Sequence, residues 1–237
     1  MVRIEVPDQP VNPTGRSTGV DLGLTAFVVT EHDETTIANP RFARNAKKAV
    51  AHSQRNMARK MKGSKNYAKT KKQSAIVQQK IARPRADHHH KQQARGLVAV
   101  YDRIGLEDLA IKNMMRKGAS RQKSGLNRSF ADAGLGQFSS IVVWQAKKQG
   151  RQTVVFDPRN TTQTCSGCGA KAKPRIELSH RVFRCSKCGL VIGRDRSSAH
   201  NLNPDRMGPG GGTKPPGVVP SDDDGVKSRV PAGSPAA

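Results

Sequence analysis

Acidic and aromatic residues are scarce in this chain. Phe, Trp and Tyr make up 4% of the 237 residues and hydrophobic residues 35%, which supplies the core of one moderate domain and argues against two large ones. Only 18 Asp and Glu stand against 42 Lys and Arg, so the formal net charge is +24. This excess is atypical of metabolic enzymes and favours a polyanionic partner, because side chains that neutralise phosphates release counterions.

Long apolar runs are missing too. No stretch reaches the ~20 consecutive apolar residues of a transmembrane helix, and residues 1–7 lack the apolar segment of a secretory signal. We therefore expect a cytoplasmic protein with no membrane partner. In such a reducing compartment the four cysteines of the chain are better explained as metal ligands than as disulfides.

The cysteines form two matched pairs, each with two residues between its members. Their spacing is typical of two zinc knuckles that close one tetrahedral site of four thiolates, with the ligands Cys165, Cys168, Cys185 and Cys188. A thioredoxin-like redox pair is the alternative, but it does not explain a second matched pair or the lack of a surrounding βαβ pattern. Four thiolates saturate zinc, so we expect a structural ion without an activated water.

Three acids stand in contexts that suit a second kind of metal site. Asp21 lies on a predicted strand whose own face carries only Gly19 and Gly23, which leaves room for a metal ion and a phosphate backbone. Glu107 ends another predicted strand, and Asp195 opens a short helical pattern whose face packs inward. Carboxylates of this kind bind Mg²⁺, which supports phosphodiester hydrolysis. Spacing alone leaves a structural alternative open for each acid. Asp21 would then be a turn former, Glu107 a charge at a strand end and Asp195 a helix N-cap.

Short apolar stretches predict the strands of a mixed α/β fold. Residues 19–40 read as two or three strands in a meander, because apolar residues alternate there with turn residues. Residues 97–109 predict a buried strand that ends near Glu107, and residues 152–157 predict another.

A strongly basic segment separates these strands. Residues 41–95 contain seventeen Lys and Arg but a single acid, Asp87, and predict two long, mostly polar helices broken near residues 63–64. A charge run is usually a solvated face, but solvated faces normally mix signs, so nucleic-acid contact is the better interpretation. The candidate contacts in this segment are Arg41, Arg55, Arg59 and Lys60.

A further helix is expected before the cysteines. Ser129, with Asp132 three positions later, predicts an N-cap for a helix that reaches about residue 150. Leu135, Phe138 and Val142 mark the face of this helix that we expect to be buried. Trp144 and Tyr101 fall in apolar patterns, so we expect them in the core and not as platforms for stacked bases. The three histidines 88–90 point in different directions on a helix, cannot form one metal site alone and are expected on the surface.

Six short segments stand out in order along the chain. They are 19–24 (GVDLGL), 63–66 (GSKN), 105–109 (GLEDL), 157–169 (DPRNTTQTCSGCG), 183–189 (FRCSKCG) and 194–202 (RDRSSAHNL). In order and in spacing, over roughly residues 17–203, they resemble the C-terminal half of TnpB, the OrfB-type transposase of bacterial and archaeal insertion sequences.

The resemblance implies an RNase H-like (RuvC-like) nuclease, related to type V CRISPR effectors. Its fold is a mixed sheet with helices on both faces, a basic helical insertion and a four-cysteine zinc ribbon. Together with composition it divides the chain into an extended N-terminal segment (1–17), a core (18–162) with the insertion 41–95, a zinc ribbon (163–191), a final core helix (192–203) and a disordered Pro/Gly-rich tail (204–237).

The resemblance also implies an activity and partners. Proteins of this family use a transposon-encoded guide RNA to direct cleavage of double-stranded DNA and take part in transposition and DNA recombination. The family's catalytic acids fall on Asp21, Glu107 and Asp195, which implies catalytic Mg²⁺ beside structural Zn²⁺. DNA is then the expected partner. The protein is expected in the cytoplasm of a prokaryote, associated with the nucleoid.

The sequence departs from the family in two respects. The last family motif usually reads Asp-Arg-Asp-x-Asn-Ala-Ala, whereas Gly193, Ser197 and Ser198 occupy three of these positions here. The family's N-terminal half, which grips the guide RNA and reads a short DNA motif, is absent before Met1, so guide-RNA binding and targeting are expected to be lost without it.

Three hypotheses remain at this point. The first is a Mg²⁺-dependent DNA endonuclease with the three acids as metal ligands. The second is a truncated, catalytically inactive remnant that folds around zinc and binds nucleic acid with little sequence preference. The third, a basic zinc-ribbon protein of the ribosome, leaves the ordered carboxylate motifs unexplained.

Overall fold

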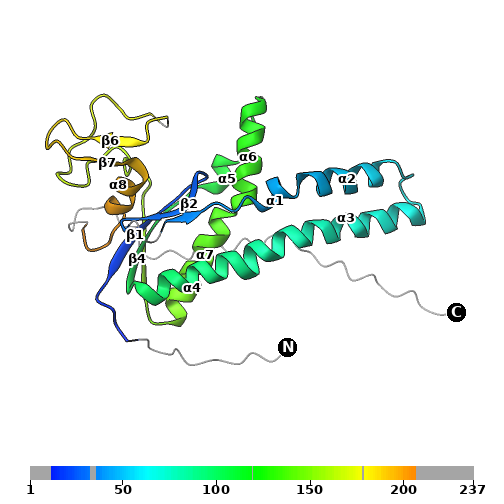
Figure 1. The fold of residues 1–237 in the computed structure, drawn as a ribbon, viewed down its shortest axis with the longest axis horizontal. Helices are drawn as coiled ribbons and strands as arrows, with labels where there is room; N and C mark the ends of the chain where they lie inside the picture. The colour runs from blue at the N-terminus through cyan, green and yellow to red at the C-terminus, as the bar shows by residue number, and fades with distance from the viewer. Residues whose placement is uncertain (1–11, 33–35, 119, 178, 207–237) are drawn as a thin grey trace.

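The computed structural model describes residues 12–32, 36–118, 120–177 and 179–206 (Figure 1). Most of the expected N-terminal segment and of the expected disordered tail, residues 1–11 and 207–237, lies outside the described residues. Between them a mixed sheet is covered by helices, a helical hairpin projects from it, and a small two-stranded module lies beside it (Figure 1).

A five-stranded sheet of order β3-β2-β1-β4-β5 forms the centre of the fold. The first three strands form the predicted antiparallel meander, while β4 and β5 run parallel to β1. The strands are β1 (Ser17–Leu22), β2 (Ala26–Thr30), β3 (Ile37–Ala38), β4 (Arg103–Glu107) and β5 (Gln152–Phe156). The two acid-bearing strands β1 and β4 are therefore direct neighbours.

Helices make up most of the remaining described chain. Those before β4 are α1 (Phe42–Asn45), α2 (Lys47–Ala58), α3 (Lys65–Arg83), the π-helical segment η2 (Pro84–His90) and α4 (Lys91–Val100). Those after β4 are α5 (Ile111–Met114), α6 (Arg121–Ala133), α7 (Leu135–Lys148) and α8 (Arg194–Asn201). No helix of the described ranges is long and apolar enough to cross a bilayer.

The predicted pair of basic helices is present as the hairpin α2–α3 (Figure 1). Gly63 adopts a positive φ of 89° at the break, and the Ser64 hydroxyl caps α3 by accepting from the Tyr67 N–H at 3.1 Å. The helix then continues through η2 and α4 as one long rod, because the wider π-helical turn accommodates the ring of Pro84.

The predicted strand over residues 97–109 is wrong in its first half. Ala94, Leu97, Val98 and Tyr101 follow the helical period and are buried. They pack with α7 in the main core, so α4 extends to Val100 and the strand itself is limited to the five residues of β4. Tyr101 lies in the core as expected.

The helix start predicted at Ser129 is also wrong. Ser129 lies inside α6 and donates its hydroxyl to the Gly125 carbonyl at 3.1 Å, as interior serines do. The side chain that caps α6 is Ser120, which accepts from the Lys123 N–H. Gly134, with φ 61°, then separates α6 from α7.

Helices cover both faces of the sheet. α4 and α7 supply the core on one face, where α7 buries Leu135, Phe138 and Val142 as predicted. α8 packs on the other face, against β1 and β2. The sheet is thus a layer between helices, and its central strands bury the side chains of Val20, Phe27, Ile104 and Leu106.

Two aromatic predictions fail. His90 is buried and stacks on Phe27 with ring centroids 5.2 Å apart, and burial lowers its pKa to about 4. Trp144, expected in the core, has 58% of its surface exposed on α7. It lies on the side of the helix opposite Val142, whose side chain occupies the core.

Candidate functional site

Helix α8 lies so close to the sheet that only glycines fit beneath it. A Cβ added at Gly19 would stand 2.0 Å from the Ala199 carbonyl oxygen, and one added at Gly105 would stand 1.7 Å from that of Leu202. The space beside Asp21 at Gly19 was expected to admit a metal ion and a phosphate backbone. That expectation is wrong for Gly19, because the backbone of α8 fills the space.

This close packing brings the three predicted acids to one place. Gly19 and Gly105 are register partners on parallel strands, so Asp21 and Glu107, each two residues further on, lie on the same face. Asp195 reaches them from the first turn of α8. Burial raises the pKa of Asp21 to about 8, with smaller contributions from the negative charges of Glu107 and Asp195.

Each acid has a different environment. In the described part of the chain, no donor lies within hydrogen-bond distance of the Asp21 carboxylate. Burial raises the pKa of Glu107, and a hydrogen bond from the Thr161 hydroxyl to Oε1 at 3.0 Å opposes that shift. Asp195 Oδ1 accepts from Arg194 Nη2 at 2.8 Å, and Arg181 Nη1 lies 3.9 Å from Oδ2.

A negatively charged cluster of this kind requires a cation. Arg194 is the cation in closest contact, and its charge also lowers the pKa of Asp21. Arg194 and, at 3.9 Å, Arg181 pair with Asp195, whereas among the described residues neither Asp21 nor Glu107 has a basic side chain within ion-pair distance. The donor set of oxygen atoms fits a hard divalent ion such as Mg²⁺.

A buried acid that sequence reasoning missed holds the far end of α8. Glu31, at the end of β2, accepts from Asn203 Nδ2 at 2.6 Å through Oε1. Its Oε2 lies 3.2 Å from His200 Nδ1 and 3.0 Å from Arg206 Nε. Nothing in the sequence distinguishes Glu31 from a turn residue, because its partners come from the other end of the chain.

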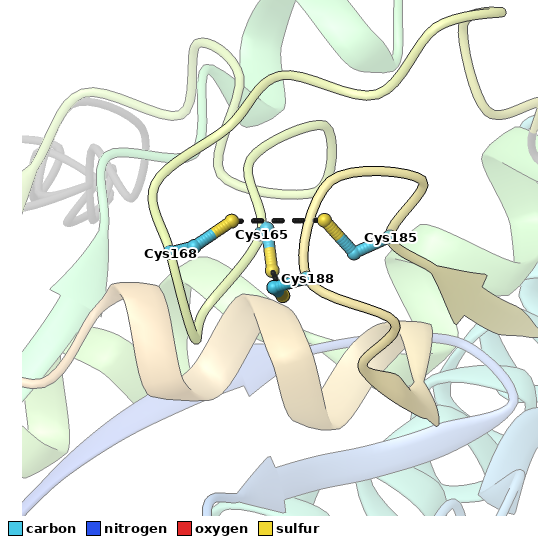
Figure 2. Close-up of side chains that lie close together, drawn as sticks. All are labelled: Cys165, Cys168, Cys185 and Cys188. Atoms are coloured by element: carbon cyan, nitrogen blue, oxygen red, sulfur yellow. Dashed lines mark hydrogen bonds between the residues drawn. The ribbon is translucent and has the colours of Figure 1, made fainter.

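The four cysteines converge in a separate module (Figure 2). Its strands β6 (Val182–Arg184) and β7 (Val191–Gly193) form an antiparallel pair, and Phe183 fills its small core. All four sulfurs lie within 4.8 Å of one another, and none is in a disulfide. The grouping of these four residues is as the spacing predicted.

The sulfur geometry tests whether the cluster fits zinc. Cys165 and Cys188 have their sulfurs 3.6 Å apart, and Cys168 and Cys185 3.7 Å. Zn–S bonds of about 2.3 Å in a tetrahedron place sulfurs about 3.8 Å apart, so the residues fit that ion. Backbone N–H groups of Cys188 and Lys187 lower the pKa of Cys185 to about 6, which favours a thiolate ligand.

One segment connects the cysteine module to the acids. Residues 160–165 run from the Thr161 hydroxyl, bonded to Glu107, to the first cysteine. Asn201 on α8 holds this segment by donating to the carbonyls of Thr161 and Thr164, both at 2.8 Å. Ser197, at a position where the sequence departs from the family motif, lies 3.2 Å from the Ser166 hydroxyl. Thr161 stands in the 157–169 motif, which was the available signal for its role.

The predicted nucleic-acid contacts divide into two groups. Arg55 lines a groove of about 840 Å³ between α2 and α3 together with Lys47 and Lys48, and Arg59 and Lys60 are exposed at the end of α2. Arg41 instead serves the fold, since its guanidinium donates to the Leu24 carbonyl at 3.1 Å and its φ is 51°. Its long side chain is only partly exposed.

Comparisons with known proteins agree with this architecture. The family model "Probable transposase" (OrfB_IS605) matches residues 1–118, and the model "Cas12f1-like, TNB domain" matches residues 136–202. The solved Cas12f1-sgRNA-target DNA complex superimposes with a TM-score of 0.56 and 20% identity, over 86% of this chain and 52% of that one. The protein therefore has a mixed α/β fold that resembles this part of Cas12f1.

Two curated relatives define the family more closely. A "Putative RNA-guided DNA endonuclease" of Streptomyces pristinaespiralis is 31% identical over 81% of this chain and 46% of its own length. The "Putative RNA-guided DNA endonuclease InsQ" of Escherichia coli K12 is 32% identical over 81% of this chain and 50% of its own. The chain spans about half the length of these relatives. It belongs to the TnpB-like, OrfB-type proteins, as its motifs indicated.

Proposed function

We propose that this protein is a TnpB-type DNA endonuclease with an RNase H-like (RuvC-like) core. The observation that supports the proposal is that Asp21 and Glu107 lie on one face of the sheet, close enough to each other and to Asp195 of α8 for both negative charges to raise the pKa of Asp21. In this reading Arg194 partly neutralises the cluster until a divalent ion binds.

The three carboxylates would hold Mg²⁺, which supplies an activated water and stabilises the charge that develops during phosphodiester hydrolysis. The residues around them orient the ligands. Thr161 fixes the Glu107 carboxylate through its hydroxyl, and Glu31 anchors the end of α8 that follows Asp195. The close fit of α8 over Gly19 and Gly105 sets the distance between the acids on the strands and the acid on the helix.

The four cysteines are proposed to hold a structural zinc ion, because four thiolates leave no open coordination position. The zinc ribbon so formed would stabilise the segment that carries Thr161. Zinc thus supports the acid site through the protein and does not enter the reaction.

DNA is the proposed substrate, and a guide RNA is a second partner whose binding we expect only in the full-length family. The names of the two curated relatives and the sgRNA-bound complex of the Cas12f1 neighbour support both. The basic groove between α2 and α3 would contact phosphates through Arg55. Arg59 and Lys60, which are exposed at the end of α2 outside the groove lining, are proposed to extend this contact. Arg41 is not included, because its guanidinium is engaged with Leu24.

The test is cleavage of labelled single- and double-stranded DNA by zinc-loaded protein in Mg²⁺, with and without guide RNA. Asp21→Asn and Asp195→Asn should abolish cutting while the variants stay folded. Glu177→Gln, an exposed acid of the cysteine module, is the matched control and should cut as the wild type does.

A folded wild type that binds DNA but does not cut under any of these conditions would contradict the proposal. The inactive nucleic-acid-binding remnant would then be the correct description. Cutting that survives both Asn variants would instead contradict the assignment of the acids.

A further inference from the structure

The outer face of α7 carries a large aromatic side chain in water. α7 buries Leu135, Phe138 and Val142 against the core, while Trp144 is 58% exposed on the other side. More than half of the apolar surface of this side chain therefore remains in water and contributes no burial to the stability of the fold. Such side chains are typical of interaction sites.

Trp144 borders a groove of about 540 Å³ between α7 and the η2–α4 rod. Ile141 and Ala86 supply apolar lining beside the indole, and Gln137 and Ser140 supply polar groups. α7 packs against both η2 and α4 of the rod (Figure 1). The groove is therefore built by two helices of the rigid core.

The charges around the groove are almost all positive. Lys148 Nζ stands over the indole ring, 5.5 Å from its centroid, and Lys147 is exposed beside it. Asp87 is the one acid among the residues that line the groove, and Lys91 neutralises it at 2.8 Å. The ligand that fits an aromatic platform with cations at its rim is flat, apolar on its faces and linked to negative charge.

An unpaired base of a single-stranded nucleic acid has this chemistry. Bases stack on exposed aromatic rings whatever their sequence, while lysines at the rim contact the phosphates. A duplex does not fit, because its bases are already stacked on one another. A second copy of this chain does not fit either, because its own net charge of +24 would repel the basic rim.

We infer that Trp144 is a stacking platform for an unpaired base of single-stranded DNA or RNA, with Lys147 and Lys148 as phosphate contacts. This site is separate from the acids, which lie on the α8 face of the sheet. The inference rests on the proposed function only in taking nucleic acid as the partner, and it does not depend on cleavage.

The chain contains a single tryptophan, so its fluorescence reports on this site alone. The full protein is titrated with a twelve-nucleotide oligothymidylate, without Mg²⁺ and without chelator, so that zinc is retained and no cutting occurs. A matched oligomer of abasic sites carries the same phosphates but no bases, and a dye on each oligomer reports binding by anisotropy.

The oligothymidylate should quench the tryptophan emission, and the abasic oligomer should bind without quenching it. Trp144→Ala should weaken binding of the oligothymidylate about ten-fold and leave that of the abasic oligomer unchanged, whereas Trp144→Phe should restore most of the affinity. Leu126→Ala, which removes an exposed side chain of α6, is the control and should change neither.

Binding of oligothymidylate without a change in emission, or equal quenching by both oligomers, would overturn the inference. So would an emission change that follows protein concentration alone, since that would make the groove a contact between copies. Because none of these readouts involves cutting, failure of the inference is distinct from failure of the proposed nuclease activity.

Discussion

The Thr161 hydroxyl donates a hydrogen bond of 3.0 Å to Glu107 Oε1, although the two residues are 54 positions apart in the chain. The bond joins the end of β4 to the segment that leads into the first cysteine pair. Asn201 of α8 holds the same segment through two carbonyls. The acids and the cysteine module therefore share one polar connection.

Thr161→Val should test this connection, because it removes the donor and keeps the shape of the side chain. Without the donor the pKa of Glu107 rises further, so the acid limb of the pH profile of cleavage should move to higher pH. Thr161→Ser retains the hydroxyl and should behave as the wild type. Equal profiles for all three proteins would show that the hydroxyl does not act on Glu107.

Gly105→Ala should detach α8 from the sheet. The added methyl would lie 1.7 Å from the Leu202 carbonyl oxygen and 2.9 Å from the Phe156 ring, so the helix has to move. We expect a loss of about 3 kcal/mol in the free energy of unfolding, measured with urea.

Gly96→Ala is the matched control for that substitution. Gly96 lies in α4 with nothing within 4 Å of an added Cβ, so alanine should stabilise the helix by about 0.5–1 kcal/mol. A Gly105→Ala protein as stable as this control would contradict the close packing of α8.

Asp21→Asn should remove a pH dependence of stability in the Mg²⁺-free protein. The pKa of Asp21 is about 8 in the folded state and near the ordinary 3.8 in the unfolded state. Between these values the folded state holds a proton that the unfolded state has released, so stability falls as pH rises, by up to about 1.4 kcal/mol per unit.

The difference in unfolding free energy between Asp21→Asn and the wild type should therefore grow from pH 5 to pH 8, in favour of the variant. Urea unfolding at several pH values measures it, and Glu177→Gln serves as the control with a constant difference. A difference that does not change with pH would mean that Asp21 is ionised throughout this range.

Cys188→Ser should release the metal from the cysteine module. The wild type is expected to contain one zinc per chain by mass spectrometry, and the variant none, because serine is a poor zinc ligand. Cleavage should fall as well. Without the metal the segment that carries Thr161 is less well held, and the Thr161 hydroxyl orients the Glu107 carboxylate while Asn201 holds the Thr161 carbonyl.

Ser186→Ala, within the same knuckle, should retain both metal and activity. If Cys188→Ser keeps a full complement of zinc, the four-thiolate site is wrong. A wild type that is purified free of metal, with its thiols oxidised in pairs, would favour the redox alternative.

The amino-acid sequence determined the local features of this protein. Four cysteines in matched pairs are enough to predict their cluster, because each knuckle is closed by a few neighbouring residues. The first meander, the basic hairpin and the buried face of α7 followed from short periodic patterns. Residues 97–100 fit both the two-residue period of a strand and the period of a helix. They form a helix in the structure, where they pack against α7.

Only the tertiary structure decided how the acids are arranged and what surrounds them. Gly19 looks like space for a ligand in the sequence, but Gly19 and Gly105 are the surface on which α8 lies. Glu31 and Thr161 act through partners more than fifty positions away, a relation that no local pattern records. Trp144 follows an apolar pattern yet faces water, because it lies on the side of α7 opposite Val142, whose side chain occupies the core.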